Sequence, residues 1–488
     1  MFVDGFTDER SVQLEPLREK EEEYLHVGFD MHAVLRRVLR NGGEYADLYL
    51  ERSSPLSIQC EDDRIEKVIA GREYGAGLRL ISGKRTAYAY TNELTTSSLL
   101  GLAEGMSRSV SDSERSGERT IMLHRTSAVG NGSFVKQPPE KVSMDRKADM
   151  VKRANHVARN FDPRVRQVLV TYRENCQEVL IATSSGEVFE DTRSYLTAMV
   201  QVVASAGGTV QTGYESVGGL IGMELFDAEP LEIAAEKAAR RALMMLTARK
   251  APAGRMPVVL SSDAGGTMIH EAIGHGLEAD LAQAGLSVYS GKIGQQIASP
   301  LVTVVDDATL PGRRGSFRVD DEGIKAQRTV LVEQGILKTY LYDRLTAMKD
   351  GARSTGNGRR ESYRHRPIPR MTNTMIAPGI TKPADILKAT PNGLFVRKMG
   401  GGQVNTVNGD FVFEVSEGYR IENGRIGDPV RGATLVGNGP TVLMSIDLVG
   451  SDLGFSIGTC GKDGQGSPVS DAQPTLRIPE ITVGGEVE

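Results

Sequence analysis

His270 and His275 bracket a glutamate, Glu271, in an otherwise apolar, helix-forming stretch, MIHEAIGHGLE (268–278). In zinc hydrolases two helical histidines bind the metal, and the adjacent glutamate takes a proton from the attacking water. Only seven histidines occur in 488 residues, so two of them beside a glutamate favour a metal site. The alternative is a buried helix whose two histidines are simply hydrogen-bonded.

The spacing of these histidines is unusual. The pattern is His-Glu-x-x-x-His, one residue longer than the common His-Glu-x-x-His. On a regular helix, residues i and i+4 lie about 40° apart, whereas i and i+5 lie about 140° apart. Two ligands of one ion cannot diverge that far. If both histidines bind one metal, the helix must contain a π-bulge or loosen at Gly274.

A zinc site needs at least three protein ligands, so a third must come from elsewhere in the chain. Cys460 is the preferred candidate, because glycines flank it and Lys462 nearby would help stabilise a thiolate. Glu278 has a poor helical phase relative to both histidines. Asp280 or a residue of Asp320-Asp321-Glu322 could reach the site, although an acidic cluster before a glycine is typical of a solvated turn. A small buried thiol at position 460 fits the residues equally well, so the third ligand stays open.

Composition narrows the class of protein. Hydrophobic residues make up 39% and charged residues 25% of the chain, its formal net charge is −5, and three cysteines are widely scattered. These values are typical of a soluble globular protein in a reducing compartment. There is no apolar run long enough to span a membrane, and the acidic N-terminal segment has no secretory core. We therefore expect a cytoplasmic protein with neither a membrane nor a nucleic acid as partner.

The predicted fold class is α+β. Fifty-five glycines among short β-branched runs indicate a turn-rich β protein. Residues 1–250 are expected to form an N-terminal α/β domain with a mixed or antiparallel sheet, with sub-regions at about 30–130 and 140–250. Residues 251–488 are expected to form a C-terminal β-rich domain that carries the metal-binding helix.

Capping residues and hydrophobic periodicity predict the positions of several helices and strands. Asp30 can cap a helix, and 109–137 is polar and aperiodic, as in a linker. Helices are predicted at 96–108, 144–157 and 231–246, and strands at 75–81, 86–90, 167–172, 178–183 and 194–204.

Longer motifs add a resemblance to a known family. The matching segments include YGAGLRLISG (74–83), MIHEAIGHGLEAD (268–280), GGQVNTVNGDFVFEVSEGY (401–419) and CGKDGQ (460–465). With these segments the chain resembles the TldD branch of the TldD/PmbA family of microbial metallopeptidases, over nearly its whole length and in the same order. The sister branch, PmbA or TldE, lacks the His-Glu-x-x-x-His helix, so the resemblance is to the catalytic branch.

The resemblance implies roles for four residues. His270, His275 and Cys460 correspond to the metal ligands of one Zn²⁺ per chain, and Glu271 corresponds to the catalytic base. It also implies a peptidase for unfolded or small polypeptides, with an enclosed site in which the substrate pairs as an added β-strand. Family members pair as a heterodimer with a PmbA/TldE-type subunit or as a homodimer. The chain departs from the family pattern at Asn405, where an aspartate usually follows GGQV.

Other functions remain possible from the sequence. The chain could be a metal-binding, non-catalytic scaffold subunit, although an intact Glu271 argues against that role. It could be an amidohydrolase acting on small molecules, or a thiol hydrolase with Cys460 as nucleophile. A donor for the oxyanion is expected near Tyr363, Arg364, His365 and Arg370, but a basic surface loop fits their spacing equally well.

Overall fold

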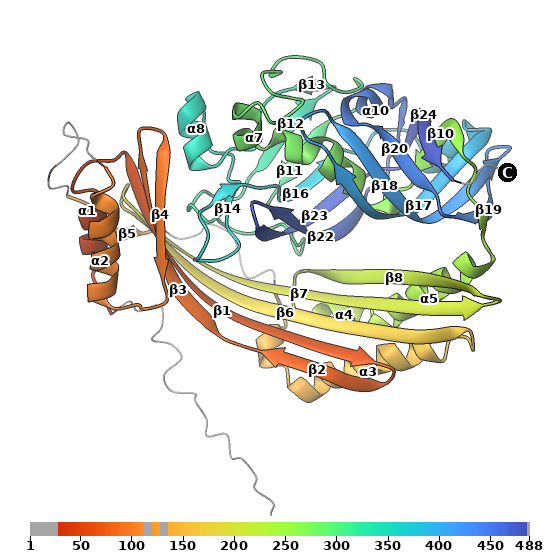
Figure 1. The fold of residues 1–488 in the computed structure, drawn as a ribbon, viewed down its shortest axis with the longest axis horizontal. Helices are drawn as coiled ribbons and strands as arrows, with labels where there is room; N and C mark the ends of the chain where they lie inside the picture. Colours follow the sequence, from red (N-terminus) through yellow and green to blue (C-terminus); the bar gives the residue numbers. More distant parts are fainter. Residues whose placement is uncertain (1–27, 111–116, 118–119, 127–134, 486–488) are drawn as a thin grey trace, which may run out of the picture.

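The computed structural model describes residues 28–110, 117, 120–126 and 135–485 (Figure 1). Much of the segment predicted as a linker, 109–137, therefore lies outside the described residues.

A long, curved sheet forms the lower half of the molecule in Figure 1. Its central strands run antiparallel in the order β4-β3-β1-β6-β7-β8, while β2 pairs with β1 and β5 pairs with β7. The strands are β1 (Tyr45–Glu61), β2 (Arg64–Ala70), β3 (Glu73–Ser82), β4 (Arg85–Thr91), β5 (His124–Arg125), β6 (Val165–Thr183), β7 (Glu187–Ala206) and β8 (Thr209–Leu220).

Two predicted strands, 167–172 and 178–183, proved to be one. β6 runs without interruption from Val165 to Thr183. The polar residues between the predicted strands, 173–177, pair with β1 on one side and with β7 on the other. Their backbone is therefore held by neighbours distant in sequence, which local hydrophobic alternation does not reveal.

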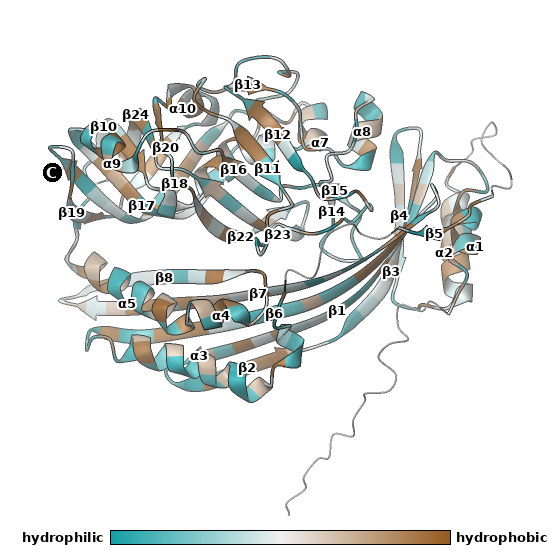
Figure 2. Ribbon diagram, turned by 180° about the vertical axis from the view of Figure 1, so that it is seen from behind, coloured by the Kyte–Doolittle hydropathy of each residue, from teal (hydrophilic) through white to brown (hydrophobic). Residues whose placement is uncertain are grey.

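Helices cover this sheet on its outer face and at one end. Asp30 caps α1, as predicted, by accepting from the backbone N–H groups of His32 and Ala33. Apolar side chains of α3 and α5 pack on the sheet face that points away from the C-terminal half (Figures 1 and 2). The helices are α1 (Met31–Val38), α2 (Thr96–Ser107), α3 (Met144–Arg159), α4 (Glu224–Ala228) and α5 (Leu231–Thr247).

The C-terminal half contains two larger sheets around a shared core. In one, β17 pairs with both β10 and β18, so the sheet closes on itself. It contains β9 (Arg249–Lys250), β10 (Gly254–Leu260), β17 (Asn392–Val404), β18 (Asp410–Glu422), β19 (Arg425–Arg431), β20 (Thr434–Asn438), β21 (Leu448–Val449) and β24 (Leu476–Gly484).

The other sheet ends in an edge strand, β22, which points toward β8. It contains β11 (Val304–Asp307), β12 (Arg328–Glu333), β13 (Ile336–Leu337), β16 (Asn373–Ile376), β22 (Gly454–Lys462) and β23 (Gln465–Gln473), and a separate pair is formed by β14 (Gly358–Arg359) and β15 (Ile368–Pro369). The outer helices are α8 (Arg344–Asp350), α9 (Pro383–Lys388) and α10 (Gly439–Ser445). The predicted α+β class, with an antiparallel N-terminal sheet and a β-rich C-terminal half, is confirmed. Within the described ranges, no helix is long and apolar enough to cross a bilayer.

Buried ion pairs join the curved sheet to the C-terminal half. Arg79 of β3 contacts Asp47 of β1 at 2.6 Å and Glu322 at 2.5 Å, and all three side chains are at most 1% exposed. Arg193 of β7 contacts Asp321 at 2.7 Å. The expectation that 320–322 is a solvated turn was therefore wrong. Asp321 and Glu322 are buried because arginines of the curved sheet neutralise them, whereas Asp320 accepts from backbone N–H groups.

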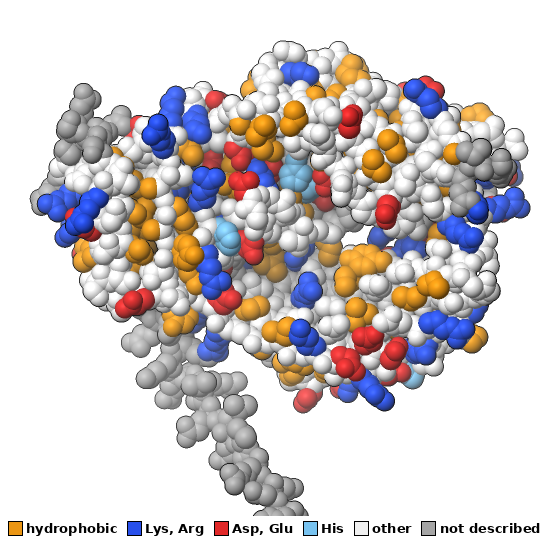
Figure 3. All heavy atoms as spheres, in the orientation of Figure 1, with side chains coloured by type: hydrophobic (Ala, Val, Ile, Leu, Met, Phe, Trp, Pro, Cys, Tyr) orange, Lys and Arg blue, Asp and Glu red, His pale blue; other side chains and the backbone are white. Residues whose placement is uncertain are grey.

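Between the two halves lies a cleft of about 1020 Å³. It is lined by residues of β8 on one side and by residues of β17, β22 and the 264–275 segment on the other. The space-filling view is hollowed along this boundary (Figure 3). The buried ion pairs thus fix the position of the curved sheet, which forms one wall of the cleft, relative to the C-terminal half, which forms the other.

We expect Arg79→Met to destabilise the fold strongly, because it leaves Asp47 and Glu322 buried without a counter-charge. Breaking a buried pair from one side costs about 3–5 kcal/mol. Thermal unfolding of the variant measures the loss. The control is Arg249→Met, which removes an exposed partner of Asp428 and should change little. Equal shifts for both variants would contradict this account of the interface.

Candidate metal centre

A π-turn carries the two histidines. Strand β10 leads through a 3₁₀ turn (Ser262–Ala264) and the short helix α6 (Thr267–Ile269) into a π-helical turn, His270–Gly274. The backbone N–H of His275 donates to the carbonyl of His270, five residues earlier. This is the deformation that the His-Glu-x-x-x-His spacing requires, since a π-turn brings residues i and i+5 to the same side.

Atoms that could bind a metal ion lie close together at three side chains. One atom each from His270, His275 and Cys460 lies within 4.8 Å of the others. The two imidazole rings meet edge to face, with centroids 4.9 Å apart. Cys460, on β22, has its Sγ 3.3 Å from Nε2 of His275. Two histidines five residues apart and a cysteine 185 residues beyond the second therefore share one small volume.

Surrounding residues hold the π-turn in place. The hydroxyl of Tyr289 donates to the carbonyl of Ala272 at 2.8 Å, inside the turn. Gly274 packs closely against Met371, since a Cβ at position 274 would lie 2.1 Å from Sδ of Met371 and would force that side chain to move. The turn is thus fixed by close packing as well as by its own hydrogen bond.

Each histidine is oriented by a buried carboxylate. Nδ1 of His270 lies 2.7 Å from Asp471 of β23, and Nδ1 of His275 lies 3.0 Å from Glu278. Both contacts use Nδ1, which leaves Nε2 of each ring for the shared volume. A carboxylate on the far nitrogen is the usual support for a metal-binding histidine.

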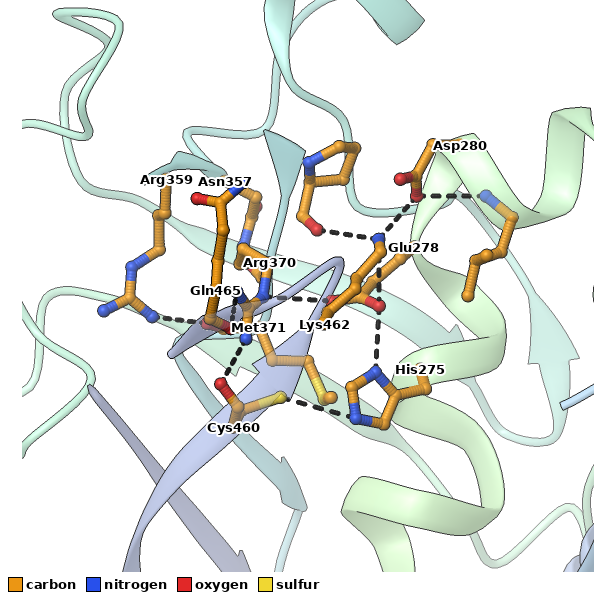
Figure 4. A network of polar contacts seen from close by, with 12 residues as sticks. His275, Glu278, Asp280, Asn357, Arg359, Arg370, Met371, Cys460, Lys462 and Gln465 are labelled. Atoms are coloured by element: carbon orange, nitrogen blue, oxygen red, sulfur yellow. Dashed lines mark hydrogen bonds and ion pairs between the residues drawn. The ribbon is translucent and has the colours of Figure 1, made fainter. Parts of the chain in front are cut away.

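Glu278 is itself part of a charged network (Figure 4). Lys462 contacts it at 3.1 Å and Asp280 at 2.7 Å, while Arg370 lies 3.9 Å from Glu278. Burial alone would raise the pKa of Glu278, but Lys462 and His275 outweigh it and lower the pKa to about 2. Glu278 is therefore a permanent anion behind His275.

The protonation pattern suits a metal-binding donor set. Burial opposes ionisation of the Cys460 thiol, yet hydrogen bonds from His270 and His275 lower its pKa to about 6. Burial would lower the pKa of His275, but Glu278 and Cys460 raise it to about 10. The pKa of His270 is raised well above its usual value, because Asp471 outweighs burial. Without a metal, the histidines hold protons that a cation would displace.

Glu271 lies on the first turn of the same segment and lines the cleft. It is partly exposed, and no described residue forms a hydrogen bond or ion pair with it. A carboxylate beside the two imidazoles is thus left available to accept a proton.

Other residues singled out in the sequence lie elsewhere. Lys462 neutralises Glu278 and Asp280 and does not contact the Cys460 thiol, so its expected role beside the thiolate was wrong. Asp321 and Glu322 belong to the ion pairs between the two halves. Asp320 instead accepts hydrogen bonds from the backbone N–H groups of Ile324 and Gly358.

The expected source of an oxyanion donor is also not at the cleft. Tyr363 is buried against the curved sheet, and neither Arg364 nor His365 lines the cleft. Arg370 is fully buried and donates to the backbone carbonyl of Cys460. Asn405 is exposed in the turn after β17, where its side chain accepts from the N–H of Val407.

Sequence reasoning missed the two carboxylates that orient the histidines. Asp471 lies on a strand with no distinguishing pattern, and only the fold brings it to His270. Glu278 carries a local signal, because it lies three residues after His275 and a side chain at that spacing shares a helical face. Its poor phase as a metal ligand does not bear on this supporting role.

Comparison with known proteins places the chain in a family. Three domain descriptions of one family match it: PmbA/TldA metallopeptidase domain 1 at residues 46–115, the central domain at 137–246 and the C-terminal domain at 253–485. A protein of Haemophilus influenzae named metalloprotease TldD homolog is 38% identical over 449 residues, covering 91% of this chain and 93% of the relative. A protein of Methanothermobacter thermautotrophicus named metalloprotease is 35% identical, covering 91% and 96%.

Solved structures share the fold. TldE from Thermococcus kodakarensis aligns with a TM-score of 0.72 at 18% identity, covering 93% of this chain and all of that one. A protein of Thermotoga maritima aligns with a TM-score of 0.74 at 22% identity, covering 90% and 96%. The sequence matches and the shared fold each cover most of the chain, and the chain belongs to the PmbA/TldD metallopeptidase family.

Proposed function

We propose that the chain is a zinc-dependent peptidase that hydrolyses peptide bonds of unfolded or small polypeptides in an enclosed cleft. The observation that carries this proposal is the convergence of His270, His275 and Cys460 within 4.8 Å, beside an unpaired Glu271. Two imidazoles and one thiolate are a donor set that suits zinc and leaves a position open for water. When bound, zinc would supply Lewis-acid polarisation and a more acidic water.

The chain's own residues would perform the remaining steps. Asp471 and Glu278 orient the imidazoles and hold their Nδ1 protons. The Glu271 carboxylate would accept the proton of the attacking water and deliver it to the leaving amine. Exclusion of bulk water would come from the cleft walls, where β8 faces β17 and β22.

The size of the cleft favours a polypeptide over a small-molecule amide. At about 1020 Å³ it reaches the upper end of small-ligand pockets, and it extends along two strands. A free Glu271 argues against a purely structural subunit. The distance of 3.3 Å between Cys460 and His275 keeps a thiol hydrolase as the second candidate.

We propose that the substrate binds as a strand added to β17. The pairing of β17 with β10 ends at Val396, so beyond that residue one edge of β17 is open. On its other edge β17 pairs with β18, but Gly400 and Gly401 form a bulge and have no partner there either. These residues line the cleft, so their backbone groups can pair with an extended peptide. The edge of β22 is less open, because Arg314 and Arg370 already donate to its carbonyls at Gly458 and Cys460.

We further propose a dimer, either with a PmbA/TldE-type subunit or with a second copy of this chain. Its support is a set of half-exposed apolar side chains in segments that backbone hydrogen bonds join in pairs, Val288 with Thr406 and Ser299 with Leu443. The set comprises Leu286, Ile293, Leu301, Val407 and, on α10, Met444. Apolar side chains left half-exposed in neighbouring segments are typical of a partner interface.

Metal content tests the ligand set. We expect about one zinc per purified chain, measured by mass spectrometry, and its loss in His275→Ala and Cys460→Ala because each removes one of three ligands. Cys176→Ala, at a cysteine of the curved sheet, should keep the metal. Zinc retained in Cys460→Ala would discard the thiolate ligand. Activity that needs Cys460 in a zinc-free protein would instead establish the thiol hydrolase.

Activity tests the base. With a denatured protein and short peptides as substrates, we expect Glu271→Gln to lower kcat by roughly 10²–10⁴-fold and to retain zinc, because only the proton acceptor is lost. The matched control is Glu229→Gln in the same cleft, whose carboxylate pairs with Lys237 and is not near the histidines. Full activity in Glu271→Gln would exclude this residue as the base.

Strand addition is tested at Gly401. We expect Gly401→Pro to lower kcat/KM for long peptides by about tenfold, because it removes one backbone donor from the edge. Gly401→Ala is the control, since a Cβ there meets no atom within 4 Å. Zinc content should be unchanged in both. Equal activities of the two variants would refute pairing at this edge.

A further inference from the structure

Lys462 connects the strand that carries Cys460 to the segment that carries the histidines. It is the last residue of β22, two positions after Cys460, so both side chains point to the same face of the strand. Its ammonium group contacts Glu278 at 3.1 Å and Asp280 at 2.7 Å, and it donates to the carbonyl of Pro369 at 3.1 Å. These three acceptors match the three donors of an ammonium group, so the contacts fix the position of the side chain.

One oxygen of Glu278 joins Lys462 to His275. Oε2 of this carboxylate lies 3.1 Å from Nζ of Lys462 and 3.0 Å from Nδ1 of His275 (Figure 4). The Glu278 side chain is fully buried and that of Lys462 is 6% exposed, so solvent screens these contacts little. The ammonium group therefore determines where the carboxylate oxygen lies, and the oxygen in turn orients the imidazole.

Cys460 lies near the end of an edge strand, where few backbone contacts hold it. Within the described ranges, β22 pairs with β23 alone, and a turn at Asp463-Gly464 joins these two strands. Side-chain contacts must therefore set the distance between this hairpin tip and the π-turn. Lys462 extends from the tip to a carboxylate that supports a histidine, so it links the two halves of the donor set.

The neighbouring charged groups do not replace this link. Nε of Arg370 lies 3.9 Å from Glu278, beyond hydrogen-bond distance, and the other donors of Arg370 go to the carbonyls of Cys460 and Gln465. The hydrogen bonds of Asp280 go to Lys462 and to its own neighbour in the chain rather than to a histidine. The connection from the cysteine strand to the His275 imidazole thus runs through Lys462 and Glu278.

We propose that Lys462 is a positioning residue of the metal site, which acts through Glu278 to hold His275 where an ion bound by Cys460 can also reach it. The inference rests on the proposed function, of which it needs the zinc site but not the cleavage of peptides. Lys462 contacts neither the thiol nor an imidazole, so its removal leaves all three ligands in the chain. Loss of such a supporting group lowers metal affinity by about 10–100-fold.

Zinc affinity tests the proposal directly. Competition with a chromophoric chelator measures the affinity of the full-length protein in the absence of any peptide. We expect Lys462→Met to bind zinc about 10–100-fold more weakly than the wild type, because Glu278 is no longer held against His275. The matched control is Lys147→Met, which removes a similarly buried lysine from Glu174 of the curved sheet and should leave zinc affinity unchanged.

A second pair of variants separates positioning from folding. If Lys462 acts through Glu278, Lys462→Met in a Glu278→Gln background should lower zinc affinity by about twofold at most, because the carboxylate is already lost. This comparison holds even if Lys462→Met alone does not fold, since the double variant no longer buries the Glu278 charge without a partner. A further tenfold loss in that background would show that Lys462 acts independently of Glu278, contrary to the proposal.

The absorption spectrum of the protein loaded with Co²⁺ in place of zinc reports which group has moved. We expect Lys462→Met to keep the thiolate-to-cobalt charge-transfer band, because Cys460 remains, and to change the ligand-field bands, because His275 is no longer held. Lys147→Met should reproduce the wild-type spectrum. Unchanged ligand-field bands in Lys462→Met would contradict a positioning role, even if the affinity falls.

The outcomes distinguish this inference from the proposed function. Equal zinc affinity in the wild-type and Lys462→Met proteins would overturn the inference, whether or not the wild type hydrolyses peptides. The expected loss of affinity, in a wild-type protein that cleaves no peptide, would sustain the positioning role and refute the peptidase function. A wild-type protein that binds no zinc would overturn both.

Discussion

The π-turn at His270–Gly274 is the constraint on which the site depends. On a regular helix the two histidines would point about 140° apart, and no single ion could bind both. The five-residue hydrogen bond from His275 to His270 removes this divergence. Such turns are rare because their hydrogen-bond geometry is poor. Here the cost is offset by Tyr289, which donates to a carbonyl within the turn, and by the contact of Gly274 with Met371.

A second constraint sets the position of the curved sheet. The β8 edge forms one wall of the cleft only because the sheet is fixed against the C-terminal half. Two buried ion pairs provide this connection, Arg79 with Glu322 and Arg193 with Asp321. Buried ion pairs add little net stability, but they disfavour any docking that leaves a charge unpaired. We infer that their role is to specify one arrangement of the cleft walls.

The sequence was informative wherever a local rule applied. The cap at Asp30 and the hairpin of β3 and β4 follow from turn and capping chemistry. Residue type and spacing singled out His270 and His275, while the choice of Cys460 beside them came from the family resemblance. Contacts between distant segments were not predictable. The continuity of β6 depends on two neighbouring strands, the burial of Glu322 on Arg79 of the curved sheet, and the role of Asp471 on the pairing of β22 with β23. Each requires the tertiary structure, because the local sequence is also compatible with a turn or an ordinary strand.

X-ray absorption at the zinc edge of the purified protein tests the central claim most directly, because it reports the atoms around the metal. The account predicts one sulfur at about 2.3 Å, from Cys460, and two imidazole nitrogens at about 2.0–2.1 Å, from His270 and His275. A shell of oxygen and nitrogen without sulfur, or with only one imidazole, would contradict it. If only one imidazole were bound, the π-turn would not serve to bring both histidines to one ion.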